Sequence, residues 1–335
     1  MRSRMLKVTA VAASMVVLTC ADMAARAKEK MRCSHQLPPG FHIAKVIDRW
    51  AAEVEALSGG DIDVQIFGAN ALVGARQNIP SVARGTIECA FSGNFQWGKT
   101  LPVMNVTLRP YSVTSPEMIA AWPDSEVAAY LEKKLLKKGV RNISWMFTSR
   151  MSAVTSKGKA LLEPGDFKGV KIRGLNPTVN AGLQALGAAP SAMSGSEVYQ
   201  ALSTGVIDAG LTDIGAAYAR KYFEVQDQIV ATPMFSVFYH GYVNPDWYDA
   251  LSDRAKAALS EAGRKAADWA LEATEKATGA APFRLAGENV TVHIHTADQI
   301  DAMASRMRPA FDKAFAEASG DDSGEILELL EKLAR

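Results

Sequence analysis

The sequence predicts an α/β protein with doubly wound sheets arranged in two lobes, and three observations support this. Short β-branched runs alternate with amphipathic helical runs along most of the chain, which is typical of parallel sheets covered by helices. A chain of 335 residues is long enough for two lobes with separate cores. It contains no internal repeat and no disordered linker, which favours two lobes joined by several chain crossings over two domains in series.

The N-terminal third predicts a βαβαβ unit. Its expected elements are, in order, a strand at 30–34, a helix at 42–57, a strand at 62–67, a helix at 77–83 and a strand at 87–92. Gly59 and Gly60 end the first helix, and Gly85 ends the second. This unit implies a parallel sheet with ligand chemistry at the carboxyl ends of its strands.

The rest of the chain continues with both element types. The expected elements are a helix at 116–138, strands at 143–148 and 152–156, a helix at 196–204, a strand at 206–212, an apolar segment at 229–243, a helix from the N-cap Ser252 to about 277, a strand at 290–295, and helices at 297–318 and 324–333. The predicted organisation is a signal peptide at 1–27, lobe I mainly from 28–150, lobe II mainly from 151–240, and C-terminal helices and returning segments in 241–335 that complete both lobes.

The N-terminus predicts export. Basic residues precede an apolar run at 8–18, and Ala25-Arg26-Ala27 has the small-x-small form of a cleavage site, so residues 1–27 read as a cleaved secretory signal peptide and the mature protein is expected to be periplasmic and soluble. The apolar run is too short to span a membrane. Cys20 offers the alternative of a lipidated N-terminus, which the preceding Thr19 disfavours.

Charge and cysteine content exclude some classes of function. Removing residues 1–27 takes away four basic residues and one acidic residue, so the formal net charge changes from +1 to −2. A nearly neutral chain without a long basic run gives no electrostatic case for nucleic acid. Cys33 and Cys89 then remain, each in an apolar strand-like run. Two buried free thiols are favoured over a disulfide, because neighbouring parallel strands rarely give disulfide geometry.

The segment 167–208 carries the strongest functional signal. Arg173 ends a short β-branched run, and an Asn176-Pro177 turn leads into an amphipathic run at 179–186. A strand that brings a cation to the N-terminus of a helix is how α/β folds hold an anionic ligand. The alternative is an ordinary arginine at a strand end that faces solvent.

Other motifs have competing interpretations. The run Gly93–Thr100 satisfies the phosphate-loop pattern GxxxxGK[ST], but the residues after it show no helical period, so nucleotide binding is disfavoured. Asn94, Phe95 and Trp97 could still line a pocket at the end of the preceding strand. His35 follows the first strand and could be a pocket residue or a polar loop residue.

Metal binding and catalysis find no support. His293 and His295 share a strand face without a third ligand nearby, so a solvated strand face is favoured over a metal site. The aromatic run 234–239 is expected to pack in the core. The sequence shows no GxSxG, HExxH or GxGxxG pattern in a suitable context, so we predict no catalytic residues, no cofactor, no metal and no enzyme activity.

Together, these segments resemble the substrate-binding proteins of tripartite ATP-independent periplasmic (TRAP) transporters. The resemblance covers nearly all of the mature chain and is strongest in FKGVKIRG, Leu186-Gly187-Ala188 and SEVYQALSTGVIDAG. It implies a two-lobed periplasmic binding protein fold with a hinged ligand cleft, which closes over an organic acid and presents it to a membrane permease. It also implies that Arg173 forms a bidentate salt bridge with the ligand carboxylate, and that Asn176 touches the same ligand.

The chain departs from the family pattern at three ligand-facing positions. The second arginine common in the family would align near Ser152, and Arg150 is the nearest replacement. Gly195 stands where many relatives have an aromatic residue, and its small size is expected to leave space for a larger or differently shaped acid. Thr212 stands where acid-sugar binders often have an asparagine.

The sequence therefore predicts a monomeric periplasmic receptor for a small organic anion, a carboxylate or a sulfonate. The predicted ligand-binding residues are Arg173, Arg150, Asn176, Thr212, Trp97, Asn94, His35 and Phe238. The expected partners are the ligand and the permease subunits. The alternatives are a binding protein of an ATP-driven importer, a sensor subunit that binds the acid and hands it to a signalling receptor instead of a permease, and an exported α/β enzyme.

Overall fold

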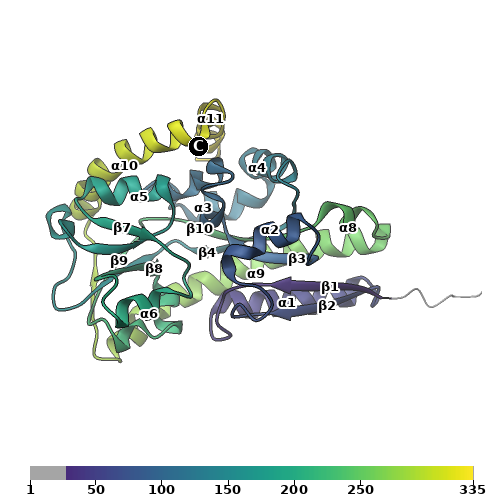
Figure 1. Cartoon of the computed structure of the whole chain (residues 1–335), viewed down its shortest axis with the longest axis horizontal. Helices are drawn as coiled ribbons and strands as arrows, with labels where there is room; N and C mark the ends of the chain where they lie inside the picture. The colour runs from purple at the N-terminus through teal and green to yellow at the C-terminus, as the bar shows by residue number, and fades with distance from the viewer. Residues whose placement is uncertain (1–27, 335) are drawn as a thin grey trace, which may run out of the picture.

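Two sheets with helices around them form the molecule, which confirms the predicted α/β class, but both sheets are mixed (Figure 1). The computed structural model describes residues 28–334, so the predicted signal peptide lies outside the described residues. A five-stranded sheet has the order β2-β1-β3-β10-β4, a four-stranded sheet has the order β11-β9-β5-β8, and β6 and β7 form a separate pair.

The five-stranded sheet begins with the predicted βαβαβ unit. Its strands are β1 (Glu29–Ser34), β2 (Ile62–Phe67), β3 (Cys89–Gly93), β4 (Arg141–Ser149) and β10 (Val237–Val243). β1 is parallel to both β2 and β3, which confirms the predicted parallel opening. β10 is antiparallel to β3 and β4, because the chain re-enters this sheet after passing through the other lobe. The sheet is therefore mixed, unlike the purely parallel sheet expected.

Helices cover this sheet with the apolar faces that their spacing predicts. They are α1 (His42–Leu57), α2 (Asn78–Ala83), α3 (Pro116–Ala121), α4 (Glu126–Leu136) and α8 (Pro245–Asp249). The buried stripe of α1 includes Trp50, whose ring meets the edge of Phe91 with centroids 5.0 Å apart. The single helix expected at 116–138 is wrong. Pro123 interrupts it within a short 3-10 turn, and Ser125 then caps α4 by accepting a hydrogen bond from the Ala128 N–H.

The second lobe is built on the other sheet and the β6-β7 pair. Its strands are β5 (Ser152–Ser156), β6 (Lys171–Gly174), β7 (Ala189–Ala192), β8 (Gly210–Asp213), β9 (Gln228–Thr232) and β11 (Thr291–Ile294). Its shorter helices are α5 (Pro177–Ala185), α6 (Val198–Ser203) and α7 (Ile214–Ala219). Strand β8 starts four residues later than expected, because a turn at Gly205, where φ is positive, is followed by residues that pair only through the isolated Ile172–Ala209 bridge.

Three long helices close the chain. They are α9 (Asp253–Ala286), α10 (Ala297–Ser319) and α11 (Asp322–Leu333). Ser252 caps α9 as predicted, accepting a hydrogen bond from the Ala255 N–H. α9 continues beyond the expected end near residue 277 and packs on α1 and β4 in one lobe and on α7 and β11 in the other. Figure 1 shows it running behind the sheets from the α8 end toward α6.

Besides α9, two short segments beside the sheets carry the chain from one lobe to the other. The chain passes from β4 to β5 through residues 150–151 and returns from β9 to β10 through residues 233–236. Such crossings are where a two-lobed fold can place groups from both lobes around one ligand.

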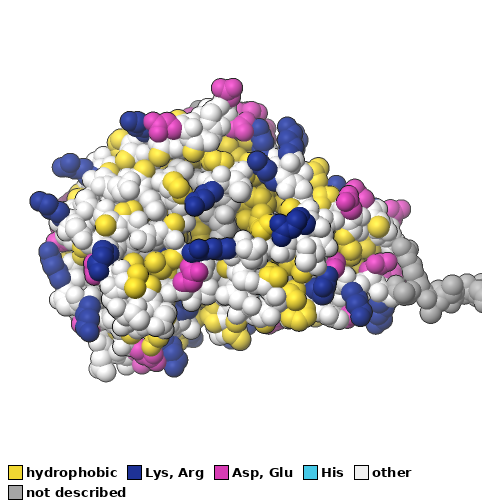
Figure 2. Space-filling model, in the orientation of Figure 1, with side chains coloured by type: hydrophobic (Ala, Val, Ile, Leu, Met, Phe, Trp, Pro, Cys, Tyr) yellow, Lys and Arg dark blue, Asp and Glu magenta, His cyan; other side chains and the backbone are white. Residues whose placement is uncertain are grey.

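The two cysteines of the core and the basic side chains of the surface bear on the sequence predictions. Cys33 and Cys89 face each other across β1 and β3 as buried free thiols, and burial is the main factor that raises the pKa of Cys33. Figure 2 shows that lysine and arginine side chains are scattered over the visible face and do not gather into one patch.

Candidate functional site

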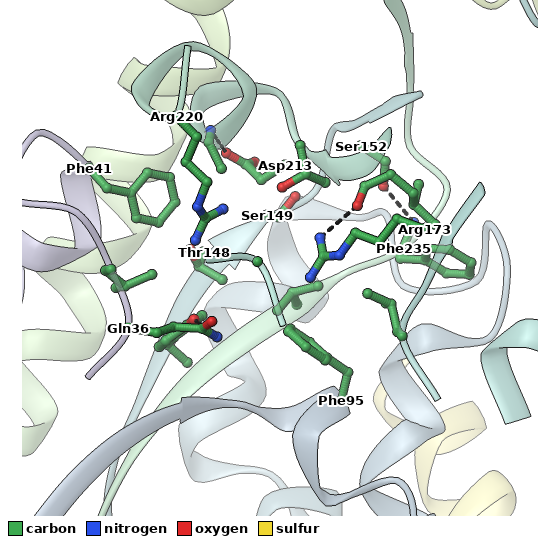
Figure 3. Close-up of a pocket in the computed structure, with 18 residues that line it drawn as sticks. Gln36, Phe41, Phe95, Thr148, Ser149, Ser152, Arg173, Asp213, Arg220 and Phe235 are labelled. Carbon is green, nitrogen blue, oxygen red and sulfur yellow. Dashed lines mark hydrogen bonds between the residues drawn. The ribbon is translucent and has the colours of Figure 1, made fainter. Parts of the chain in front are cut away.

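A small cavity lies at the crossings between the lobes and has a volume of about 60 Å³. Ser149 and Ser152, on either side of the first crossing, and Phe235 of the second crossing line its wall, so groups from both sheets face the same space (Figure 3). Apolar and aromatic side chains make up much of the lining, with a few polar and charged groups among them. The lining residues are Gln36, Leu37, Phe41, Phe95, Thr148, Ser149, Ser152, Arg173, Leu175, Gly195, Leu211, Thr212, Asp213, Ala216, Arg220, Phe235, Val237 and Tyr239.

Arg173 reaches this cavity from β6 and is only 3% exposed. Its Nη1 donates a 2.6 Å hydrogen bond to the Leu211 carbonyl, and Nε and Nη2 are each 3.4 Å from the Met193 carbonyl oxygen. Burial lowers the pKa of Arg173 to about 10, so the guanidinium is still charged at neutral pH. Within residues 28–334 it forms no salt bridge. A buried cation without a carboxylate partner is energetically unfavourable, and a bound anion would compensate its charge.

Arg220 supplies a second guanidinium at the same cavity. It follows α7, and its side chain enters the cavity from a different side than Arg173 does (Figure 3). Its positive charge also contributes to lowering the pKa of Arg173. The sequence prediction missed this residue, because nothing in the local pattern around α7 distinguishes Arg220 from an exposed arginine after a helix.

Asp213 is the acidic side chain of the lining. It caps α7, with Oδ1 accepting a 2.9 Å hydrogen bond from the Ala216 N–H. Oδ2 is buried and has no hydrogen-bond partner among the described residues. Burial raises the pKa of this carboxyl to about 6, against the smaller opposing effects of Ser149, the α7 backbone and Arg220.

Neutral polar groups complete the lining. Nε2 of Gln36 donates a 2.9 Å hydrogen bond to the Tyr239 hydroxyl, while Oε1 of Gln36 is buried and has no partner among the described residues. Thr212 lies on β8 opposite Ala153 of β5 and lines the cavity, as does Ser152. Arg173 also lies over the Phe95 ring, with 5.8 Å between Cζ and the ring centroid. The site therefore combines cations and hydroxyls with aromatic walls.

Arg173 and Thr212 are the two predicted ligand-binding residues that line this cavity. Arg150 is turned away from it and forms a salt bridge with Glu275, with 2.6 Å between Nη2 and Oε2. Asn176 caps α5, and its Nδ2 donates hydrogen bonds to the Phe95 carbonyl at 3.0 Å and to Oδ1 of Asn105 at 2.8 Å.

The other four predicted residues have partners inside the protein. Nε1 of Trp97 donates a hydrogen bond to Nε2 of His240, and Nδ2 of Asn94 donates to the Met104 carbonyl and the Thr107 hydroxyl. Nδ1 of His35 accepts a hydrogen bond from the Leu37 N–H. Phe238 stacks on Trp122, with centroids 4.7 Å apart. Its neighbours Val237 and Tyr239 line the cavity, because alternate residues of a strand face opposite sides.

The loop that matches the phosphate-loop pattern does not lead into an α-helix, as the sequence predicts. Residues 94–97 inside the loop and residues 102–108 after it form short 3-10 helices. His293 and His295 do not both face solvent, since His295 is buried with its Nδ1 3.1 Å from the Thr232 hydroxyl. In the part of the chain that the structure describes, no group of three histidine, cysteine or acidic side chains is arranged to hold a metal ion.

The fold and cavity define a class: a two-lobed α/β protein with a cavity between its lobes that two arginines line, as in extracellular solute-binding proteins. Residues 33–318 match the family model of bacterial extracellular solute-binding proteins, family 7. The chain belongs to this family and is a TRAP substrate-binding protein. This family assignment favours a TRAP permease over an ATP-driven importer.

Relatives support the assignment at the level of sequence and fold. A solute-binding protein of Albidiferax ferrireducens is 28% identical over 254 residues, covering 73% of this chain and 75% of the relative. The 2,3-diketo-L-gulonate-binding periplasmic protein of Escherichia coli is 27% identical, covering 76% and 78%. The crystal structure of a TRAP periplasmic solute binding protein from Desulfovibrio salexigens with bound orotic acid superposes with a TM-score of 0.87 at 21% identity, covering 91% and 98%. None of the helices in residues 28–334 has the length and apolar character needed to cross a membrane.

Proposed function

We propose that this protein is the periplasmic receptor of a TRAP transporter for a small organic acid, and that Arg173 binds the acidic group of that ligand. The observation that carries the proposal is a buried guanidinium that faces the cavity without a salt bridge in residues 28–334. A planar guanidinium matches a carboxylate or a sulfonate in a bidentate geometry. The two ligands named for the relatives, 2,3-diketo-L-gulonate and orotic acid, are both organic acids.

Transport follows from closure of the lobes around the acid. Groups from both sheets line the cavity, so a ligand that touches both lobes stabilises the closed form of an open–closed equilibrium. The protein is exported by its N-terminal segment, works as a monomer and delivers the acid unchanged to the permease. Phe95, Phe235 and Tyr239 would bound the carbon skeleton of the ligand, with Thr212 and Gln36 as neutral polar contacts.

Ligand binding tests the proposal. A thermal-shift screen would span dicarboxylates, 2-oxo and 2-hydroxy acids, sugar acids, aromatic acids and sulfonates, and a ligand at about a hundred times its Kd adds about 2.7 kcal/mol of stability. Arg173→Gln should weaken binding of the hit by about 3–5 kcal/mol, which is at least about a hundredfold in Kd.

Arg150→Gln is the matched control, because Arg150 is occupied by Glu275. We expect it to change the Kd by less than about threefold. Circular dichroism would confirm that both variants are folded. A loss of less than about tenfold in Arg173→Gln would show that Arg173 is not the anchor. A hit that well-folded protein converts to a product would instead support the exported enzyme.

A further inference from the structure

Because Gly195 has no side chain, the Arg220 guanidinium can occupy the space beside its Cα atom. A Cβ atom placed on Gly195 would lie 2.9 Å from Nη2, 3.0 Å from Cζ and 3.1 Å from Nη1 of Arg220. These distances are shorter than nearly all real Cβ contacts, so any larger residue at 195 would displace the guanidinium. The sequence predicts that Gly195 leaves room for a larger acid, but the structure shows that an arginine fills this room.

Two cations consequently share one small cavity. Arg173 and Arg220 come from different elements of the same lobe and both line a volume of about 60 Å³ (Figure 3). Their charges interact, since Arg220 contributes to lowering the pKa of Arg173. Bringing like charges together in a poorly hydrated site is unfavourable unless anionic groups compensate them.

Within the described part of the chain, one carboxyl group lines the cavity with the two guanidiniums, and neither guanidinium is ion-paired. Among residues 28–334, neither guanidinium has a carboxylate oxygen within salt-bridge distance. Asp213 is the acidic residue of the lining, and one of its oxygens is already engaged in capping α7. Arg220 contacts the hydroxyl of Tyr222, which is a neutral partner. The Asp213 carboxyl is close enough to Arg220 for their charges to interact but forms no salt bridge with it, so an acidic group of the ligand is the partner that can pair directly with this guanidinium.

We propose that Gly195 and Arg220 form a second anion subsite, and that the preferred ligand therefore carries two acidic groups. This inference rests on the proposed function, in which Arg173 binds the first acidic group. Arg220 then determines specificity, because a ligand without the second acidic group leaves this partly buried guanidinium without an ion-pair partner. The second group is a carboxylate or a sulfonate, since either presents oxygens to a guanidinium fork.

Matched pairs of acids test the inference by isothermal titration calorimetry. Succinate is compared with butyrate and glutarate with valerate, so that each pair differs in one carboxylate; 3-sulfopropionate tests the sulfonate. The protein should bind each diacid at least about tenfold more tightly than its monoacid. In Arg220→Gln this ratio should fall below about threefold, whereas Arg173→Gln should weaken the diacid and the monoacid alike.

Gly195→Ala tests the same idea without removing a charge. The new methyl group displaces the Arg220 guanidinium, so the diacid preference should fall as it does in Arg220→Gln. Two control variants lie away from the cavity: Arg264→Gln removes a charge from an exposed position of α9, and Gly165→Ala adds a methyl group where no atom lies within 4 Å. Both should retain the diacid preference of the unmodified protein.

The possible failures of the two proposals are distinct. Equal affinities for diacids and monoacids, or an unchanged ratio in Arg220→Gln, would overturn the second subsite while the effect of Arg173→Gln still supported an acid receptor. Well-folded protein that binds neither the monoacids nor the diacids would overturn the proposed function and the second subsite with it.

Discussion

At the scale of single residues, Asp213 links the ligand site to stability. Its carboxyl has a pKa of about 6, raised by burial from the usual 3.8. The native state therefore holds this proton at higher pH than the unfolded chain does, so the stability due to Asp213 falls as pH rises from about 4 to about 6.

Asp213→Asn should remove this pH-dependent cost. Asparagine can still cap α7 through its side-chain oxygen, so the main change is the loss of a buried charge. In ligand-free protein, we expect the variant to be more stable than the unmodified protein by up to about 3 kcal/mol at pH 7.5, and by little at pH 4. Urea unfolding at several pH values measures this difference.

Other titrating groups contribute equally to the stability of the two proteins, so their contributions cancel in that comparison. Burial lowers the pKa of His35 and His42 to about 4, and these histidines destabilise the native state as pH falls, in both proteins alike. A stability difference that did not vary between pH 4 and pH 7.5 would contradict the raised pKa of Asp213.

Arg173 and Arg220 show what the sequence can and cannot predict at this scale. Arg173 was identified because strand, turn and helix follow each other locally around it, and this local order fixes its position at the mouth of α5. Arg220 was missed because its position depends on the absence of a side chain at Gly195, 25 residues earlier in the chain. Such a contact between distant residues appears only once the fold brings α7 beside residue 195.

At the scale of elements, periodicity predicted helices and strands best where a segment has one clear buried face. The predicted bounds of α1 and β2 agree with the structure. The 116–138 helix failed because helical spacing continues on both sides of Pro123, so periodicity alone joined two helices. The antiparallel entry of β10 depends on lobe crossings, which no local pattern encodes.

Asn176, the N-cap residue of helix α5, has two structural roles. Its Oδ1 caps α5 by accepting from the Val179 N–H, and its Nδ2 donates to the Phe95 carbonyl and to Asn105 of the other lobe. Asn176→Asp keeps the cap but replaces the donor with an oxygen that faces two acceptors. We expect the free energy of unfolding to fall by about 2–3 kcal/mol, measured by urea denaturation.

Asn180→Asp is the control for that variant. It makes the same chemical change one turn further along α5, where Asn180 uses its Oδ1 to accept from the Leu175 N–H. We expect it to cost less than about 0.5 kcal/mol. Equal losses in the two variants would mean that the Nδ2 contacts of Asn176 with the other lobe contribute nothing measurable.

At the scale of the whole molecule, the lobes share a core and a long helix. The largest cluster of buried apolar residues includes Phe147 on β4 of the first sheet and Val154 and Leu211 on β5 and β8 of the second. Helix α9 packs on elements of both lobes. Loss of the contact between α9 and the sheets should therefore destabilise the molecule as one unit.

Gly263 is where α9 lies closest to β4. A Cβ atom there would clash with the Ile143 carbonyl oxygen, and the Ser144 hydroxyl donates a 3.0 Å hydrogen bond to the Gly263 carbonyl. The clashing atom is backbone, so helix and sheet must separate to admit a methyl group. Gly263→Ala should therefore lower the free energy of unfolding by about 3 kcal/mol or more.

Gly279→Ala, on the same helix, should have the opposite effect. No atom lies within 4 Å of the position that its methyl group would take, and alanine is a better helix former than glycine by about 1 kcal/mol. Urea denaturation of both variants, followed by circular dichroism and by tryptophan fluorescence, measures the two changes. The two probes should give one coincident transition for each protein, since α9 joins both lobes. A Gly263→Ala protein as stable as the Gly279→Ala protein would show that α9 is not held this closely against β4.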